Sequence, residues 1–270
     1  MNLDRIWTLM GKELREFRAS PTVLLPVVLL VVVCTLVPFG LVVVLPLVSG
    51  QSLTSDKTFQ QIIVLARQRT PDLAALAPDA AAEVFLFQQF LLLYLIAPIV
   101  GAVSLAAYSV VGEKQGRTLE PLLTTPMSTA EILVAKVLAS FLPALMIEAI
   151  GLSIYFAGIA VLASPGVAAA MFSLRSVLLI AVLGPFASLV ALQATIAVSS
   201  RVNDPRSAQQ VALLVVLPLI GMLIGQFSGA FFITIPVLLL VCAATIGGWV
   251  VLILLSVALF ERETILTRWS

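Results

Sequence analysis

The stretch from Gly112 to Lys136 reads GEKQGRTLEPLLTTPMSTAEILVAK and separates two long apolar segments of the chain. Its six charged residues are Glu113, Lys114, Arg117, Glu120, Glu131 and Lys136, and it also contains Gly116, Pro121 and Pro126. Backbone irregularity and charge of this density do not occur against lipid, because unsatisfied polar groups are costly there. We therefore expect this central segment to lie in water or against a soluble partner.

The composition of the chain around the central segment is typical of a membrane protein. Hydrophobic residues make up 61% and charged residues 11% of the sequence, and the mean hydropathy is +1.15. Ordinary soluble domains have about 45–50% apolar and about 25% charged residues. A formal net charge of +1 offers no basic surface for nucleic acid. These values predict an all-α membrane protein that does not bind nucleic acid.

The sequence argues against enzyme chemistry in this chain. It has no histidine, which excludes a HExxH zinc protease, a Ser/His dyad and an imidazole proton relay. Cys34 and Cys242 each lie within an apolar run, without the spacing of a metal site or a disulfide pair. We expect no catalytic residue and no metal ligand.

Six apolar segments predict six transmembrane helices. The first has about 27 residues, whereas about 20 are enough to span the hydrocarbon core. The predicted spans are residues 22–48, 84–111, 134–162, 175–199, 211–225 and 231–260, of which 211–225 is short. Residues 49–83 form a long external loop with a short amphipathic helix, and Pro78 and Asp79 are typical of a helix start.

Residues 1–21 have the pattern of an amphipathic helix. Its apolar positions follow helical spacing and are Leu3, Ile6, Trp7, Met10, Leu14 and Phe17. Its charged positions are assigned to the remaining faces and are Arg5, Lys12, Glu13, Arg15, Glu16 and Arg18. We expect this helix to lie in the membrane interface and to contact lipid.

The distribution of basic residues predicts the orientation in the membrane. With the N-terminus inside, the inner segments hold Arg5, Lys12, Arg15, Arg18, Lys114, Arg117, Lys136, Arg201, Arg206, Arg262 and Arg268. The outer segments hold Lys57, Arg67, Arg69 and Arg175. Eleven basic residues against four place the central segment and both termini in the cytoplasm, with the protein in the plasma or inner membrane.

Within the central segment, Ser128 and Glu131 have the spacing of a capping box directly after Pro126. A helix is therefore expected to start at Ser128 and to continue into the third span. Most helix connections have about two to eight residues, so a segment of this length favours a docking surface over a passive loop. Glu120 and Glu131 are expected to be its exposed acidic groups.

The run EKQGRTLEPLLTTPMSTAEILVAK resembles the signature of the ABC type 2 permease family. The positions that match the family pattern are Glu113, Gly116, Thr118, Leu119, Glu120, Leu122, Leu123, Pro126, Ser128, Glu131 and Lys136. The N-terminal helix, the six spans and the long first external loop resemble the family layout as well. The resemblance implies that residues 112–133 contain a cytoplasmic coupling helix that inserts into a separate ATP-binding subunit.

The resemblance further implies half of an exporter that works by alternating access, in which two permease copies, or one copy and a close relative, join two ATPase subunits. The chain has no G-x-x-x-x-G-K-[ST] phosphate loop. It is therefore not expected to be an enzyme, and ATP and Mg are expected in the partner chain. The coupling residues that the resemblance implies are Glu113, Gly116, Thr118, Leu119, Glu120, Pro126, Ser128 and Glu131.

The alternative function is a secondary transporter driven by an ion gradient. Such carriers need ionisable groups within their spans, and Glu148 is the one clear candidate. Gln88, Gln89 and Gln193 are further polar residues expected along a substrate pathway. Glu148 could equally make an interhelical hydrogen bond. The shortage of charge in the spans favours a hydrophobic or amphipathic substrate such as a drug, lipid or peptide.

Overall fold

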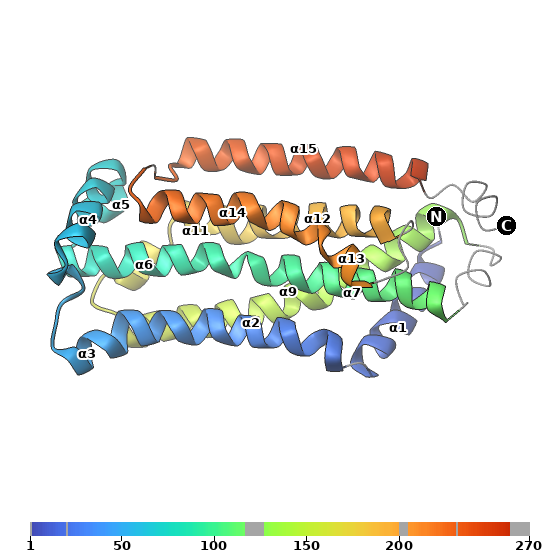
Figure 1. Cartoon of the computed structure of the whole chain (residues 1–270), viewed down its shortest axis with the longest axis horizontal. Coiled ribbons are helices and arrows are strands. Elements are labelled where there is room, and N and C mark those ends of the chain that lie inside the picture. The colour runs from blue at the N-terminus through green and yellow to red at the C-terminus, as the bar shows by residue number, and fades with distance from the viewer. Residues whose placement is uncertain (1, 20, 117–126, 200–204, 231, 260–270) are drawn as a thin grey trace.

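The computed structural model describes residues 2–19, 21–116, 127–199, 205–230 and 232–259, and the regular structure within these ranges is entirely helical. The long helices run side by side along one axis (Figure 1). Helix α1 (Leu3–Ala19) lies at one end of this bundle, inclined to its axis. The short helices α4 (Lys57–Arg69) and α5 (Pro71–Ala74) lie at the other end.

The first long helix is built from three consecutive pieces. Helix α2 (Pro21–Phe39) continues through a π-helical turn, η1 (Gly40–Val44), into α3 (Leu45–Ser49). The wide turn begins two residues after Pro38, which lacks the N–H for the regular helical hydrogen bond.

Helices α6 (Pro78–Tyr94) and α7 (Ile96–Gln115) together form the central rod of the bundle. Helix α6 begins at Pro78, where the sequence predicts a start. Aromatic rings from three helices pack together beside α6. Tyr155 of α9 contacts Phe39 of α2 and both Phe87 and Tyr94 of α6. The Tyr155 hydroxyl donates to the Phe87 carbonyl at 2.8 Å, so this buried ring keeps its polar atom satisfied.

Helix α9 (Thr129–Leu162) is the longest helix of the described residues and packs against α1, α2 and α7. The predicted capping box at its start is confirmed. Two glycines let α2 approach closely: a Cβ at Gly151 would lie 2.3 Å from Val31 Cγ1, and one at Gly158 would lie 2.5 Å from Phe39 Cζ. Small residues allow such close packing between membrane helices.

The remaining helices complete the bundle. After α9 come α10 (Val167–Met171), α11 (Leu174–Leu178), the π-helical turn η3 (Leu179–Leu183) and α12 (Gly184–Ser199). They are followed by α13 (Pro205–Gln209), α14 (Val211–Phe227) and α15 (Ile235–Leu259). Within residues 49–83, all of which the structure describes, lie the 3₁₀ turn η2 (Leu53–Ser55) and the expected amphipathic helix α4, which packs on α6.

Five helical stretches of the described residues are long and apolar enough to cross a membrane. They are Leu24–Ser49, Pro78–Glu113, Ala130–Leu162, Leu174–Ser199 and Ile235–Leu255. Helix α14 is apolar as well but shorter. The all-helical membrane class is therefore confirmed with five such helices, and the sixth span stays a prediction.

Candidate functional site

One face of helix α1 packs against the end of the bundle. Ile6, Met10 and Phe17 are buried against residues of α7 and α9, whereas Leu3 and Trp7 are 63% and 60% exposed. The expected position of this helix in the membrane interface stays a prediction. The face centred on Ile6 and Phe17 is used for packing within the protein, and its edge with Leu3 and Trp7 remains open.

Glu13 lies on the packed face of α1 and is 0% exposed. It falls seven residues after Ile6 and four before Phe17, so a helix places it on the same side as these two residues. Its assignment to an outer face is therefore wrong. Lys136, on α9, is 1% exposed and donates through Nζ to Glu13 Oε1 at 2.9 Å. Glu13 Oε2 is buried and has no hydrogen-bond partner among the described residues.

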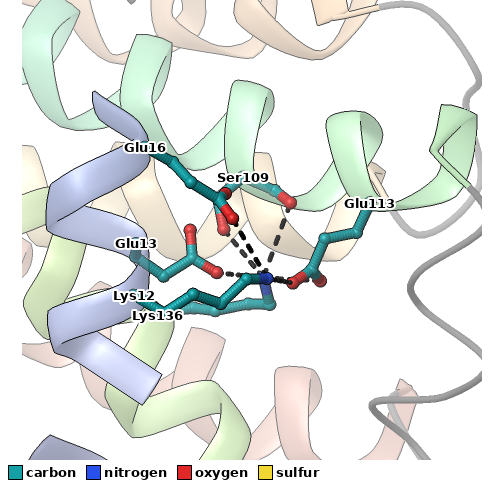
Figure 2. Close-up of polar contacts among 6 residues, drawn as sticks. All are labelled: Lys12, Glu13, Glu16, Ser109, Glu113 and Lys136. Carbon is teal, nitrogen blue, oxygen red and sulfur yellow. Dashed lines mark hydrogen bonds and ion pairs between the residues drawn. The ribbon is translucent and has the colours of Figure 1, made fainter. Parts of the chain in front are cut away.

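Lys136 also binds two residues near the end of α7. Its Nζ lies 2.8 Å from Glu113 Oε2 and donates to Ser109 Oγ at 2.8 Å. Figure 2 shows these side chains converging on the Lys136 ammonium group from α1 and α7. One buried cation therefore joins three helices, and we call Lys12, Glu13, Ser109, Glu113 and Lys136 the charged junction.

Lys12 closes the charged junction on its solvent side. Its Nζ lies 3.0 Å from Glu113 Oε1 and 3.5 Å from Glu16 Oε1, and its side chain is 43% exposed. Partial burial acts to lower the pKa of Lys12, but the hydrogen bond and charge of Glu113, with the charges of Glu16 and Glu13, raise it above 10.5. With Lys12 included, two cations balance the two buried carboxylates.

A second set of contacts ties Asn2, which directly precedes α1, to the start of α9. The Asn2 N–H donates to Glu131 Oε1 at 2.6 Å, and the Ser128 N–H donates to Glu131 Oε2 at 2.9 Å. The Glu131 N–H donates back to Ser128 Oγ at 3.2 Å. Glu131 is 5% exposed. The expectation that it is an exposed docking group is therefore wrong, because its carboxylate is used to cap α9 and hold α1.

Both ends of the segment between α7 and α9 are thus connected to α1. Glu113 lies three residues before Gly116, which follows α7 and donates its N–H to the Gly112 carbonyl at 2.8 Å. Glu131 lies at the start of α9. Four expected coupling residues lie outside the described residues, namely Thr118, Leu119, Glu120 and Pro126. Their role stays a prediction.

A groove lies beside the charged junction. Its volume is about 400 Å³, and it is lined by Asp4, Arg5, Thr8, Leu9, Lys12 and Met127. Most of these residues come from the outer face of α1, and Met127 directly precedes the cap of α9. The groove therefore offers a mixed polar and apolar surface at the α1 end of the molecule.

Glu148 lies far from this end, in the middle of the apolar part of α9. It is 3% exposed and contributes to a cavity of about 480 Å³ between α9 and the helices that follow it. The lining is Leu145, Glu148, Ala149, Leu152, Ser153, Phe156, Phe172, Ile180 and Pro185. Glu148 is thus the one ionisable residue among these lining residues, and the others are apolar apart from Ser153.

The four residues expected along a substrate pathway are not brought together in one cavity. Gln193 lines a separate cavity of about 440 Å³, between α9, α12 and α15. Gln89 Oε1 accepts from Gln226 Nε2 at 3.1 Å, and Gln226 Oε1 accepts from Arg175 at 2.7 Å. This network gives Gln89 a place in helix packing. Gln88 is buried on α6, and its side-chain polar atoms have no partner among the described residues.

A protein-family model described as "ABC-2 family transporter protein" matches residues 7–234. The match begins within α1 and ends directly before α15, so it includes the charged junction, the central segment and the Glu148 cavity. No curated protein matches the chain.

Proposed function

Because the chain belongs to the ABC-2 transporter family, as a transmembrane permease subunit without the ATPase, we propose that it is the membrane part of an ATP-driven exporter. Its coupling element is residues 112–133, which dock on a separate ABC ATPase. ATP and Mg²⁺ bind in that partner. The complex contains a second permease copy or a close relative, and both termini face the cytoplasm.

The observation that carries this proposal is the link between the coupling element and α1. Lys136 joins Glu13 on α1 to Glu113 on α7, and Glu131 on α9 holds the Asn2 N–H. A displacement of the coupling element therefore acts on α1, α7 and α9 together. Buried ion pairs resist separation, because each unpaired charge would be left in a poorly solvated site.

The surface near the coupling element is suited to a protein partner. The groove beside Met127 combines an acidic residue, basic residues and apolar side chains, a mixture typical of the polar interfaces of transient or regulated complexes. We propose that closure of the ATPase pair presses on this surface and on the coupling element. The long helices then change between an inward-open and an outward-open or collapsed arrangement, as rigid elements do in domain closure.

The secondary-transporter alternative receives less support than the ATP-driven function. It depends on Glu148 as the ion-coupling group, and family membership favours an ATPase as the source of energy. Transport by the purified chain alone, driven by a proton or sodium gradient, would reverse this choice. The apolar cavities favour a hydrophobic or amphipathic substrate.

The docking of the coupling element can be tested by charge reversal. The chain is reconstituted in lipid vesicles with the ABC ATPase that co-purifies with it, and ATP hydrolysis is measured with and without the permease. We expect Glu120→Lys to abolish most of the stimulation, because it places a like charge against the surface that receives Glu120. Glu131 is unsuitable for this purpose, since its replacement removes the cap of α9.

The matched control is Lys57→Glu, a charge reversal on exposed Lys57 at the opposite end of the bundle. It should leave stimulation unchanged. If stimulation survives Glu120→Lys at the level of this control, the coupling element is not where the ATPase docks.

A further inference from the structure

We propose that the cavity at Glu148 binds hydrophobic organic cations, such as lipophilic amines and phosphonium ions, with Glu148 as their counter-ion. The inference names a substrate class for the exporter and to that extent rests on the proposed function. The binding site itself requires only the geometry of α9 and its neighbours.

The first argument is the isolation of the Glu148 carboxyl group. Its Oε1 atom is buried and has no hydrogen-bond partner among the described residues, and no Lys or Arg of these residues pairs with it. A carboxyl group within an apolar helix is costly and is usually kept for a function. The carboxyl group is therefore available to a ligand that brings its own positive charge.

The second argument is the space beside the carboxyl group. Gly184 lies directly after the π-helical turn η3, and a Cβ added to it would be 3.6 Å from Glu148 Oε1 and 3.1 Å from Leu95 Cδ2. A larger side chain at Gly184 would therefore crowd this region. Single π turns within helices are frequent at functional sites. Without a side chain, Gly184 leaves this position beside the Glu148 carboxyl group unfilled.

The third argument is the aromatic wall of the cavity. The rings of Phe156 and Phe172 line it, with centroids 5.0 Å apart and planes inclined by 35°. Aromatic faces attract weakly hydrated organic cations through the ring quadrupole. The cavity volume of about 480 Å³ falls within the roughly 300–1,000 Å³ that is usual for small-molecule pockets.

The same lining argues against other ligands. A metal ion needs several oxygen ligands, and the described residues contain no group of three or more acidic, histidine or cysteine side chains. The Ser153 hydroxyl is already directed to the Ala149 carbonyl at 2.7 Å. A neutral lipid chain would fill the apolar walls without using Glu148. A large cation with apolar substituents uses the carboxylate, the rings and the apolar walls together.

The experiment measures equilibrium binding to the purified full-length chain in lipid nanodiscs. The probe is tetraphenylphosphonium, and its uncharged counterpart is triphenylphosphine oxide. We expect tetraphenylphosphonium to bind Glu148→Gln about tenfold more weakly than the unchanged chain, because the counter-ion is lost. The uncharged compound should bind weakly and equally to the unchanged chain and to Glu148→Gln. Equal binding also shows that the cavity is intact in the variant.

Two further variants keep the test decisive. Glu83→Gln is the matched control: Glu83 accepts hydrogen bonds from Ser164 outside the cavity, and its replacement should leave binding unchanged. Phe172→Leu changes an exposed lining residue and should weaken tetraphenylphosphonium binding about threefold, since one cation–π contact is lost. This variant replaces Glu148→Gln in the test if the latter does not fold.

The proposal is overturned if tetraphenylphosphonium binds both cavity variants as it binds the unchanged chain. It is also overturned if the uncharged compound binds as tightly as the cation, because this result would indicate a lipid-binding or apolar site. A third contradicting result is that a second copy of the chain covers the cavity and excludes the cation. Because no ATP is present, the result is independent of the exporter function. Cation binding without ATP-dependent transport would leave this site standing and contradict the proposed function instead.

Discussion

Glu13 in the charged junction and Glu148 in the apolar cavity are both almost fully buried, at 0% and 3% exposure. Glu13 has the Lys136 ammonium group 2.9 Å away, whereas Glu148 has no cation near it among the described residues. A buried pair holds two helices together because separating it leaves an uncompensated charge. A buried carboxyl group without an ion-pair partner connects no helices and can bind a ligand.

This difference separates a structural connection from a binding site. Replacing one member of the charged junction should destabilise the protein, because its partners lose their counter-charge. Replacing Glu148 should leave the stability of the protein unchanged or raise it, because no described partner depends on this residue. The free energy of unfolding of the purified chain in detergent measures this contrast.

Lys136→Met should have the largest effect. It leaves the Glu13 and Glu113 carboxylates buried without their shared cation, and removing one partner of a buried pair costs about 3–5 kcal/mol. Lys57→Met, at an exposed position of α4, is the control and should change stability little. A loss equal to that of the control would show that Lys136 does not connect the three helices.

Ser128→Ala should have an intermediate effect. The Ser128 hydroxyl accepts from the Glu131 N–H, and loss of an N-cap of this kind costs about 1 kcal/mol. Faster hydrogen exchange should be confined to the first turn of α9. Thr245→Ala removes a hydroxyl that donates to the Val241 carbonyl within α15 and serves as the control. Equal hydrogen exchange in both variants would argue against a capping role.

Lys12→Met should have a smaller effect, because Lys12 is 43% exposed and its ion pairs are partly solvated. Such pairs contribute about 0–1 kcal/mol. Since the pKa of Lys12 is raised above 10.5, its contribution is complete below that pH and is lost as the pH rises through the raised pKa. The stability difference between the unchanged chain and Lys12→Met should therefore close above about pH 10.5. A difference that grows in that range would contradict the assignment.

Glu148→Gln should have the smallest effect on stability. With no described cation beside it, the carboxyl group loses no ion pair on replacement, and stability should be unchanged or higher by about 1 kcal/mol. The measurement is the same unfolding experiment, performed without added ligand. A loss comparable to that of Lys136→Met would mean that Glu148 is a structural group, and the contrast between the two regions would be invalid.

Much of the fold follows from local patterns in the sequence. The run of apolar residues from Leu24 to Ser49 is long enough to span a membrane by itself. The capping box at Ser128 and Glu131 depends on a spacing of three residues and on a hydroxyl and a carboxylate. These features need no information about distant parts of the chain, which is why they could be predicted.

The charged junction could be predicted only in part. Glu13 lies seven residues after Ile6 and four before Phe17, so its spacing alone was enough to place it on the packed face. The distant partners could not be read from spacing: Lys136 is 123 residues from Glu13, and the Asn2 N–H is 129 residues from Glu131. Likewise, Gln89 was grouped with Glu148 by residue type, although its contacts join it to Gln226.

The central claim is that the charged junction transmits the action of the ATPase to the long helices, and Glu113→Gln tests it most directly. This change removes the ion pair with α7 but keeps the hydrogen bond from Lys136 to Ser109 and the buried pair of Glu13 with Lys136. Lys12 retains Glu16. Its matched control is Glu16→Gln, since Glu16 is 47% exposed and also binds Lys12.

The measurement is the amount of substrate transported per ATP hydrolysed by the reconstituted permease–ATPase complex, with subunit stoichiometry checked for each variant. The account predicts that Glu113→Gln still assembles and hydrolyses ATP but transports much less substrate per ATP, while Glu16→Gln behaves as the unchanged complex does. An unchanged transport ratio in Glu113→Gln would contradict the account.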